Sequence, residues 1–339
     1  MKRTVYRIKK AGSLKKLKSR YEDLAPPAVD EVTVEVKAIG LNFADLFAIL
    51  GLYSATPKGS FIPGLEYSGI VLETGKDVEN YKSGDRIMGT IRFGAYATHL
   101  NINHHYILKM PEEWSFEESA AFMVQSLTAY YALVELGNLK INNTVLIHSA
   151  AGGVGIFANR IAKKFNAFTI GTIGSEFKKE FLKNEGYDKV IVRDKHFKNQ
   201  LSEVLGNRNL NIVLDCIGGK IFRDSFNSLA PSGRIIIYGG AQFMSKSSTP
   251  NYFKIIPKFL FRPKVDPLSL SNTNHSVMGF NLIYLWDKPN ELKNMLLEIL
   301  NMNIKPPHIG KVYSFDDLIE ALKFFQSGNT IGKIVVKIN

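Results

Sequence analysis

The segment Val145–Ile156 constrains the fold more than any other part of the chain, because it places a glycine-rich turn between a strand and a helix. A short apolar run enters the turn, and a helical pattern leaves it. Gly152 lets the backbone approach a pyrophosphate closely, and Gly155 lets the helix pack tightly against the strand. The pyrophosphate then binds at the helix N-terminus, where free N–H groups and the helix dipole favour an anion. Ala150 stands at the first position of the usual GxGxxG pattern, and glycines in such turns also serve packing alone. The strand–turn–helix context nevertheless predicts a dinucleotide-binding loop.

The order of predicted elements divides the chain into two domains. The first third is rich in short strands, and Val32–Lys37 alternates apolar and polar residues as a half-buried strand does. From about residue 122 onward strands alternate with helices, which indicates a parallel sheet with right-handed crossovers. A last predicted strand, Lys333–Ile338, suggests that the chain returns to the first domain. We therefore predict an α/β protein with a doubly wound Rossmann domain at residues 123–268 and a substrate domain made of residues 1–122 and 269–339.

The composition is typical of an ordinary globular protein. Hydrophobic residues make up 45% of the 339 residues and charged residues 22%, so the chain can bury the cores of two domains. The N-terminus lacks the apolar stretch of a signal peptide, and no apolar run approaches the length of about 20 residues that spans a bilayer. A single cysteine, Cys216, excludes an intramolecular disulfide and a multi-cysteine zinc site. We therefore expect a cytoplasmic protein.

The net charge of +12 admits two interpretations. Such an excess attracts nucleic acid or an anionic membrane surface, but a lysine-rich solvated surface gives the same value. The densest basic cluster lies between Lys9 and Arg20, and aromatic residues do not interleave it as a nucleic-acid platform requires. Nucleic acid is therefore not an expected partner.

Seven motifs occur in order along the chain and together resemble one family. They are Gly40–Asp45, Gly51–Tyr53, Pro63–Gly69, Gly84–Met88, Leu127–Tyr131, Ala150–Gly155 and Gly332–Val335. They resemble the zinc-free quinone oxidoreductase branch of the medium-chain dehydrogenase/reductase superfamily. Within that branch, Asn274–Leu282 and Ile304–His308 are similar to the group that contains the vesicle amine transport protein. The resemblance implies a GroES-like β-barrel domain with an inserted Rossmann domain. It also implies a homodimer paired through an edge strand, here Gly233–Tyr238 or the segment after it.

The positions that hold catalytic zinc in zinc-dependent relatives carry other residues in this chain. The resemblance places Asn42, Leu65 and a residue near Val124 where those relatives have cysteine or histidine ligands. Zinc requires thiolate, imidazole or carboxylate ligands, and leucine and valine supply none. No metal site is therefore expected.

The residues after the second predicted Rossmann strand, Phe168–Thr172, favour NADPH over NAD. An acidic residue at the strand tip would bind the adenosine ribose hydroxyls, but Gly174 and Ser175 follow this strand. The Ser175 hydroxyl and the Lys178 ammonium suit a 2′-phosphate, and such residues accompany NADPH in the family. Arg193 stands where the family often has a tyrosine, and it either adds charge to this site or points to solvent.

The resemblance also assigns the rest of the cofactor site. Its residues are Gln125, Thr128, Ala151, Gly152, Gly153, Val154, Gly155, Gly239, Gly240, Phe280 and Lys333. Gln125 and Thr128 would lie near the nicotinamide and its ribose, although both also suit ordinary helix packing. Lys333 would contact the cofactor, although a surface lysine is an open alternative.

Hydride transfer to a conjugated acceptor is the chemistry that such a site supports most easily. Without a Lewis acid, the protein must position the acceptor and donate a hydrogen bond or a proton to its oxygen. Asn42 and Tyr53 stand where the family's substrate cleft lies and carry an amide and a phenol donor. Asn42 also suits a turn and Tyr53 a loop anchor. We predict an NADPH-dependent reductase of a quinone or another α,β-unsaturated carbonyl, with Asn42 and Tyr53 as catalytic residues.

The segment Tyr252–Arg262 raises an alternative function. Its apolar residues are interspersed with cations, which is typical of an interfacial segment, and also of a dimer contact or a lid. The group that contains the vesicle protein is linked to membranes. The alternative is therefore an NADPH-binding protein that associates with membrane or lipid and has little catalytic activity.

Overall fold

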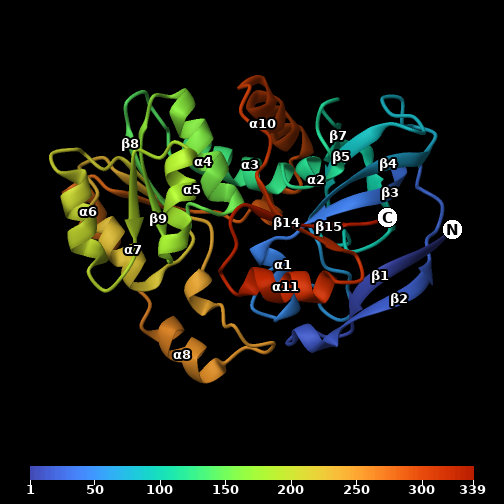
Figure 1. The fold of residues 1–339 in the computed structure, drawn as a ribbon, viewed down its shortest axis with the longest axis horizontal. Coiled ribbons are helices and arrows are strands. Elements are labelled where there is room, and N and C mark those ends of the chain that lie inside the picture. Colours follow the sequence, from blue (N-terminus) through green and yellow to red (C-terminus); the bar gives the residue numbers. More distant parts are fainter.

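Two large sheets organise the molecule, one in each half of Figure 1. The computed structural model describes residues 1–339. Helices cover both faces of the six-stranded sheet on the left, and the seven-stranded sheet lies on the right, near the N- and C-termini. Helix α3 (Met123–Tyr130) and strand β15 (Lys333–Lys337) lie near the centre, where the two halves meet.

All strands of the six-stranded sheet pair in parallel, in the order β10-β9-β8-β11-β12-β13. They are β8 (Thr144–His148), β9 (Phe168–Ile173), β10 (Lys189–Val192), β11 (Ile212–Asp215), β12 (Arg234–Ile237) and β13 (Ser276–Gly279). The helices that connect them are α4 (Gly153–Lys164), α5 (Lys179–Asn184), α6 (Phe197–Leu205) and α7 (Gly219–Phe226), with the 3-10 turn η4 (Glu176–Lys178) before α5.

Alternate residues of β8 face opposite layers of this domain. Val145 and Ile147 belong to the core that contains Phe157 of α4, whereas Leu146 belongs to the core that contains Phe197 of α6. Successive side chains of a strand point to opposite faces, so a strand covered on both faces must be apolar throughout. This explains the uninterrupted apolar run before the glycine turn. The predicted doubly wound parallel sheet is confirmed.

The seven-stranded sheet has the order β14-β15-β3-β4-β5-β7, with β6 paired to β3. Its strands are β3 (Glu31–Gly40), β4 (Glu66–Thr74), β5 (Arg86–Thr90), β6 (His99–Asn103), β7 (Ile107–Lys109), β14 (Ile309–Ser314) and β15. The same domain contains the hairpin of β1 (Lys2–Ile8) and β2 (Leu17–Asp23), the helices α1 (Phe43–Ile49), α2 (Phe116–Ser119) and α11 (Leu318–Gln326), and the 3-10 turns η1 (Leu14–Lys16) and η2 (His104–Tyr106).

The end of the chain completes the domain that the beginning starts. β15 pairs with β3 in antiparallel fashion, with Val335 opposite Gly40, and both Ile334 and Val336 enter the core of this domain. The predicted return of the chain to its first domain is therefore confirmed.

The predicted domain boundary at residue 268 is wrong for the segment that follows it. β13 pairs in parallel with β12 and so extends the Rossmann sheet. Helix α10 (Pro289–Asn301) buries Leu296 and Ile299 in the same core as α3 and α4. β13 is too short to show a strand period, which is why the sequence pattern missed it. β13, and not the strand within Gly233–Tyr238, forms this edge of the sheet. The predicted homodimer would therefore pair through the segment after Gly233–Tyr238.

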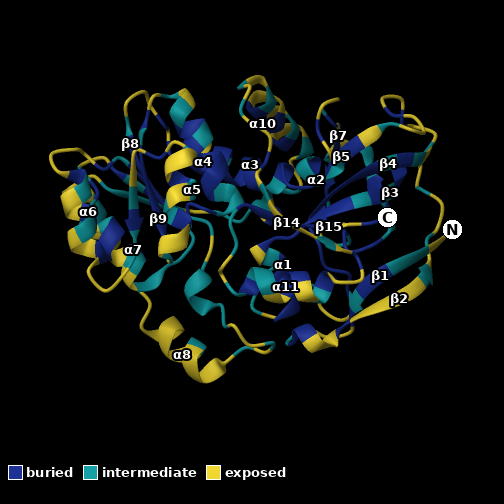
Figure 2. Ribbon diagram, viewed as in Figure 1, coloured by how far each residue is buried: buried dark blue, intermediate teal, exposed yellow.

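Helix α8 (Tyr252–Leu260) protrudes from the Rossmann side, and Figure 2 shows it exposed along its length. It is followed by α9 (Pro267–Thr273). The remaining elements are the π-helical turn η3 (Tyr131–Leu136) and the 3-10 turns η5 (Ala241–Phe243) and η6 (Leu282–Leu285). None of the helices has the length and apolar character needed to cross a bilayer.

Candidate active site at the domain junction

A cavity of about 970 Å³ lies between the two domains and receives side chains from both. It brings together nearly every residue that the sequence predicted. These are Asn42, Tyr53, Gln125, Thr128, Ala151, Gly152, Gly153, Val154, Gly155, Gly174, Lys178, Gly239, Gly240, Phe280 and Lys333. Ser175 is the exception, because its half-buried side chain does not line the cavity.

The glycine turn forms one wall of the cavity and begins α4. A Cβ on Gly155 would lie 2.6 Å from both Cα and the carbonyl O of Ala150, so Gly155 is required for packing of the helix on the turn. A Cβ on Gly152 would approach only the carbonyl O of Ser149, at 3.3 Å. That contact is tight, but a shift of a few tenths of an ångström would relieve it, so packing inside the protein constrains Gly152 far less than Gly155. The N–H of Gly332 donates to Ala151 O at 2.8 Å and ties the turn to the other domain.

A second wall lies beyond the end of β9, where Gly174, Lys178 and Arg193 line the cavity. Lys178 Nζ donates to Gly328 O at 2.6 Å. Burial, followed by the nearby positive charge of Arg193, lowers the pKa of Lys178. Of the two orientations that the sequence left open for Arg193, the structure shows the one toward the cavity.

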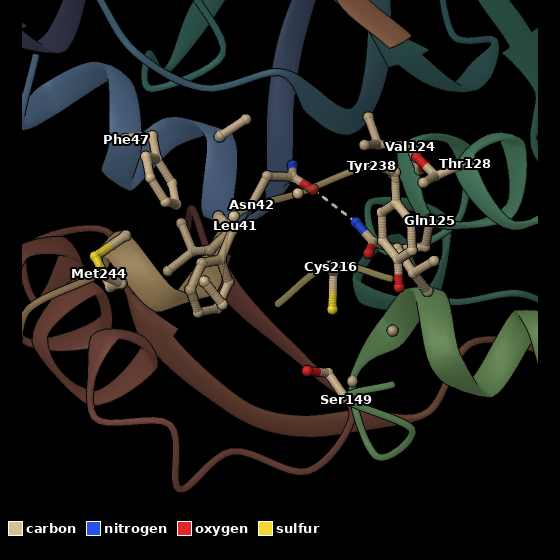
Figure 3. A pocket seen from close by; sticks show the side chains of 18 of the residues that line it. Leu41, Asn42, Phe47, Val124, Gln125, Thr128, Ser149, Cys216, Tyr238 and Met244 are labelled. Carbon is tan, nitrogen blue, oxygen red and sulfur yellow. Dashed lines mark hydrogen bonds between the residues drawn. The ribbon is translucent and has the colours of Figure 1, made fainter. Parts of the chain in front are cut away.

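A buried polar cluster occupies the junction of the domains. The amide Nδ2 of Asn42 donates to Glu66 Oε1 at 3.0 Å and to Gly40 O at 3.2 Å. The amide of Gln125 donates to Asn42 Oδ1 at 2.6 Å, as Figure 3 shows, and to Glu66 Oε1 at 3.0 Å. Lys333 Nζ donates to Asn42 Oδ1 at 3.0 Å and forms an ion pair with Glu66.

This cluster changes what two predicted residues offer to a ligand. Both hydrogens of the Asn42 amide have acceptors within the protein, so Asn42 supports the cluster and offers no free donor to a substrate oxygen. Lys333 is buried with its ammonium on Glu66, and burial lowers its pKa. Thr128 lines the cavity, but its hydroxyl donates to Val124 O at 2.6 Å.

The residues at the zinc position of the superfamily do not fit a zinc ion. Leu65 and Val124 line the cavity with apolar side chains. The one carboxylate there, Glu66, is paired with the Lys333 ammonium and accepts the N–H of Val124 at 3.0 Å. No group of three or more His, Cys, Asp or Glu residues has a metal-binding arrangement. Neither thiolate nor imidazole is available, and a cation already neutralises the carboxylate.

Asp45 contacts the backbone of Asn42 in this cluster, and the pKa of its carboxyl group is raised. Its Oδ2 accepts the N–H of Asn42 at 2.8 Å and the hydroxyl of Tyr96 at 2.9 Å, while its Oδ1 is buried without a partner. Burial raises the pKa of Asp45 to about 7, and these two hydrogen bonds only partly oppose the rise. Asp45 does not line the cavity, and its carboxylate completes the capping box of α1 by accepting the Asn42 backbone N–H.

Asp45→Asn tests this titration. The folded protein retains a proton on Asp45 up to pH 7, whereas the unfolded chain releases it near 3.8. The stability that the protonated form contributes is complete below about pH 4 and is lost as the pH rises toward 7. We expect the wild type to lose about 2–3 kcal/mol of unfolding free energy relative to the Asn variant between pH 5 and 7.5, measured by urea unfolding.

Asp188→Asn is the control, because hydrogen bonds from Lys163 and Thr169 outweigh burial and hold the pKa of Asp188 below its ordinary value. The wild type should lose no such free energy relative to this variant over the same pH range. Parallel pH profiles of the wild type and Asp45→Asn would contradict the assignment.

Aromatic side chains also line the cavity, among them Tyr53, Phe280 and Trp286. Tyr53 Oη donates to Asn281 Oδ1 at 2.7 Å and so joins the two domains. Burial raises the pKa of Tyr53 to about 12. Trp286 lines the cavity and stacks on Tyr106 with ring centroids 4.2 Å apart. The sequence did not single out Trp286 or Glu66, although an acid in a buried strand signals a paired charge.

Comparisons with known proteins agree with this architecture. Residues 28–112 match the family described as alcohol dehydrogenase GroES-like domain, and residues 153–300 match the family described as zinc-binding dehydrogenase. The predicted GroES-like domain is thereby confirmed.

Individual relatives extend the similarity over the whole chain. The human synaptic vesicle membrane protein VAT-1 homolog is 33% identical over 96% of this chain and 84% of its own length. The crystal structure of the human VAT-1 homolog-like protein superposes with a TM-score of 0.85 at 27% identity, covering 100% of this chain and 99% of that one. The Escherichia coli quinone oxidoreductase complexed with NADPH gives 0.84 at 27% identity, covering 99% and 100%. The chain belongs to the medium-chain dehydrogenase/reductase superfamily, in the quinone oxidoreductase branch that includes the VAT-1 homologs.

Proposed function

We propose that this protein is an NADPH-dependent reductase that transfers hydride to a quinone or another α,β-unsaturated carbonyl. The observation that carries the proposal is one cavity at the domain junction that is lined both by the glycine turn and by aromatic side chains. Two cations at its other wall suit the additional phosphate of NADPH. The relative from Escherichia coli, described as a quinone oxidoreductase complexed with NADPH, supports the same assignment.

In such a reaction, different parts of the cavity would bind the cofactor and the acceptor. The N-terminus of α4 and the open space at Gly152 accommodate a pyrophosphate. NADPH supplies a hydride when bound, and a conjugated acceptor spreads the resulting negative charge onto its oxygen. The aromatic walls at Phe280 and Trp286 exclude water and hold a flat acceptor.

Tyr53 is the residue that we place at the acceptor oxygen. Its phenol stays protonated at neutral pH because its pKa is raised to about 12, so it is a donor and not a base. The hydroxyl now donates to Asn281. Turning that hydrogen from Asn281 Oδ1 to the substrate oxygen would stabilise the developing charge.

NADPH oxidation tests this function directly. Purified protein should oxidise NADPH in the presence of ortho-quinones, para-quinones or alkenals, followed at the nicotinamide absorbance with NADH as comparison. Tyr53→Phe should lower kcat by about 10–100-fold, because one oxyanion donor is lost.

Tyr284→Phe is the matched control. It removes a phenol hydroxyl that also bonds across the domains, to Ser54 at 3.1 Å, but lies outside the cavity. An unchanged kcat in Tyr53→Phe removes Tyr53 from the mechanism. Failure of all three acceptor classes overturns the reductase proposal.

A second candidate function rests on helix α8. None of its residues is buried, and the exposed fractions of Phe253 in the helix and of Phe261 directly after it are 94% and 81%. Lys254, Lys258 and Arg262 are interspersed with these apolar residues, and no acid occurs between Asp224 and Asp266. An apolar and cationic helix of this kind fits the surface of an anionic bilayer. The alternative function is therefore an NADPH-binding protein that docks on anionic phospholipid.

Vesicle flotation separates this candidate from a lid or a dimer contact. The protein should float with phosphatidylserine vesicles and not with phosphatidylcholine vesicles, and Phe253→Ser combined with Phe261→Ser should abolish flotation. Tyr21→Ser, which removes an 83% exposed aromatic residue from β2, should leave it unchanged. Equal flotation with both vesicle types, or none, rejects the anionic membrane.

A further inference from the structure

After β12 the chain leaves the Rossmann sheet and reaches the other domain before it returns at β13. We call residues Ala241–Pro250, which lead toward α8, the strap. Five of its residues line the cavity: Ala241, Phe243, Met244, Ser245 and Lys246. β12 and β13 are neighbours in one sheet, so the path of the chain does not force the strap to reach the other domain. That contact therefore depends on the strap's own interactions.

Gln326 of α11 holds the strap against the substrate domain. The residue is 6% exposed, and its amide Nε2 donates to Ser247 O at 2.9 Å and to Ser245 O. The backbone N–H of Leu14 donates to Ser248 O at 2.9 Å. The two hydrogens of the Gln326 amide thus match two carbonyl groups of the strap.

The other end of the strap is fixed to the Rossmann domain. The backbone N–H of Ala241 donates to Cys216 O at 2.8 Å, and Lys258 Nζ of α8 donates to Gln242 O at 2.7 Å. Between the two ends, Met244 packs against the core of the substrate domain, and Figure 3 shows it across the cavity from Thr128. The strap therefore bridges the two domains along one side of the cavity.

The strap is weakly held apart from these anchors. None of its residues is buried, and side-chain hydrogen bonds within it join Ser245, Ser247 and Thr249 to one another. Segments with few buried apolar groups and exposed hydrogen bonds open at a small cost in free energy. Releasing the bonds to Gln326 and Leu14 would free the strap from the substrate domain without unfolding a helix or a sheet strand.

We propose that the strap is a gate for NADPH and that the Gln326 amide is its latch. A closed latch ties the two walls of the cavity together and slows both entry and release of the cofactor. The latch bonds join protein atoms only, so they oppose both steps alike. Opening of such a segment limits turnover in many enzymes. This inference rests on the proposed binding of NADPH but not on any acceptor being reduced.

Stopped-flow fluorescence of NADPH tests the gate on the full chain without relying on turnover. The association rate constant comes from mixing at several NADPH concentrations, and the dissociation rate constant from displacement by excess NADP⁺. Gln326→Leu should raise both constants by about 5–50-fold, because two hydrogen bonds are lost, and should change Kd by less than about twofold. Gln200→Leu, which removes an amide that donates to Val192 O at 3.3 Å outside the cavity, should alter neither rate.

Gln326→Glu tests the latch with almost no change in shape. An ionised carboxylate only accepts, so it would face two carbonyl oxygens without a hydrogen to share, whereas a protonated carboxyl group regains one donor. Both rate constants of this variant should exceed those of the wild type more at pH 8 than at pH 5.5. A pH-dependent rate that reverses within one variant cannot arise from misfolding.

The outcomes are distinct. Unchanged rates in both Gln326 variants overturn the latch and leave the reductase function intact. A faster release with unchanged entry overturns the gate, because it shows that Gln326, which also lines the cavity, holds the cofactor by direct contact. Faster entry and release in a protein that reduces no acceptor supports the gate and rejects the reductase function.

Discussion

Lys333→Met is expected to lower the free energy of unfolding by about 3–5 kcal/mol, the cost of leaving a buried charge without its partner. The side chains of Lys333 and Glu66 are 4% and 1% exposed, so water cannot replace the lost ammonium. The Asn42 and Gln125 amides donate to Glu66 but bring no positive charge. The loss should appear in urea unfolding at pH 7.

Two further variants separate charge loss from loss of packing. Lys333→Met combined with Glu66→Gln removes both charges and should recover most of the stability. Lys337→Met makes the same substitution at the end of the same strand, where the lysine is 55% exposed and paired with Glu117, and should cost less than about 1 kcal/mol. A double variant as unstable as Lys333→Met would show that packing of the lysine stem, not its charge, stabilises the junction.

Gly152→Ala is expected to weaken NADPH binding on the order of 100-fold while the protein remains stable. The backbone at Gly152 has φ −86° and ψ 167°, which alanine adopts without strain, and the new Cβ would meet only Ser149 O, at 3.3 Å. The methyl group would instead occupy the space through which a pyrophosphate approaches the backbone. A fluorescence titration with NADPH, together with a thermal unfolding curve, measures both effects.

Gly155→Ala provides the contrast within the same turn. Its Cβ would lie 2.6 Å from Ala150 backbone atoms, so the helix must shift, and we expect a loss of about 1–3 kcal/mol in stability. Unchanged affinity in Gly152→Ala would show that the pyrophosphate does not approach this turn. A stable Gly155→Ala variant would contradict the packing argument.

The sequence predicted correctly those elements whose pattern of apolar and polar residues reflects which of their faces are buried. The apolar run before the glycine turn is continuous because both faces of β8 are covered, and Val32–Lys37 alternates within the strand β3. Short elements without a period were missed. β13 spans only Ser276–Gly279, and its place in the Rossmann sheet follows from pairing with β12, a contact between residues about 40 positions apart.

Motifs also placed residues at the cavity more reliably than they assigned what each residue does there. Asn42 and Lys333 both line the cavity, yet their hydrogen-bonding groups face Glu66 and each other. Arg193 was noticed in the sequence as a departure from the family, but its orientation depends on Thr172 of β9, which accepts a hydrogen bond from the Arg193 guanidinium.

By itself, the sequence determined the two-domain α/β fold and the glycine turn, because periodicity and motif order are local properties of the chain, and the resemblance to a family implied most of the residues around the cavity. The tertiary structure alone decided which polar groups remain free for a ligand. That choice depends on hydrogen bonds between residues as distant as Asn42 and Lys333, and a buried donor that finds an acceptor inside the protein is no longer available outside it.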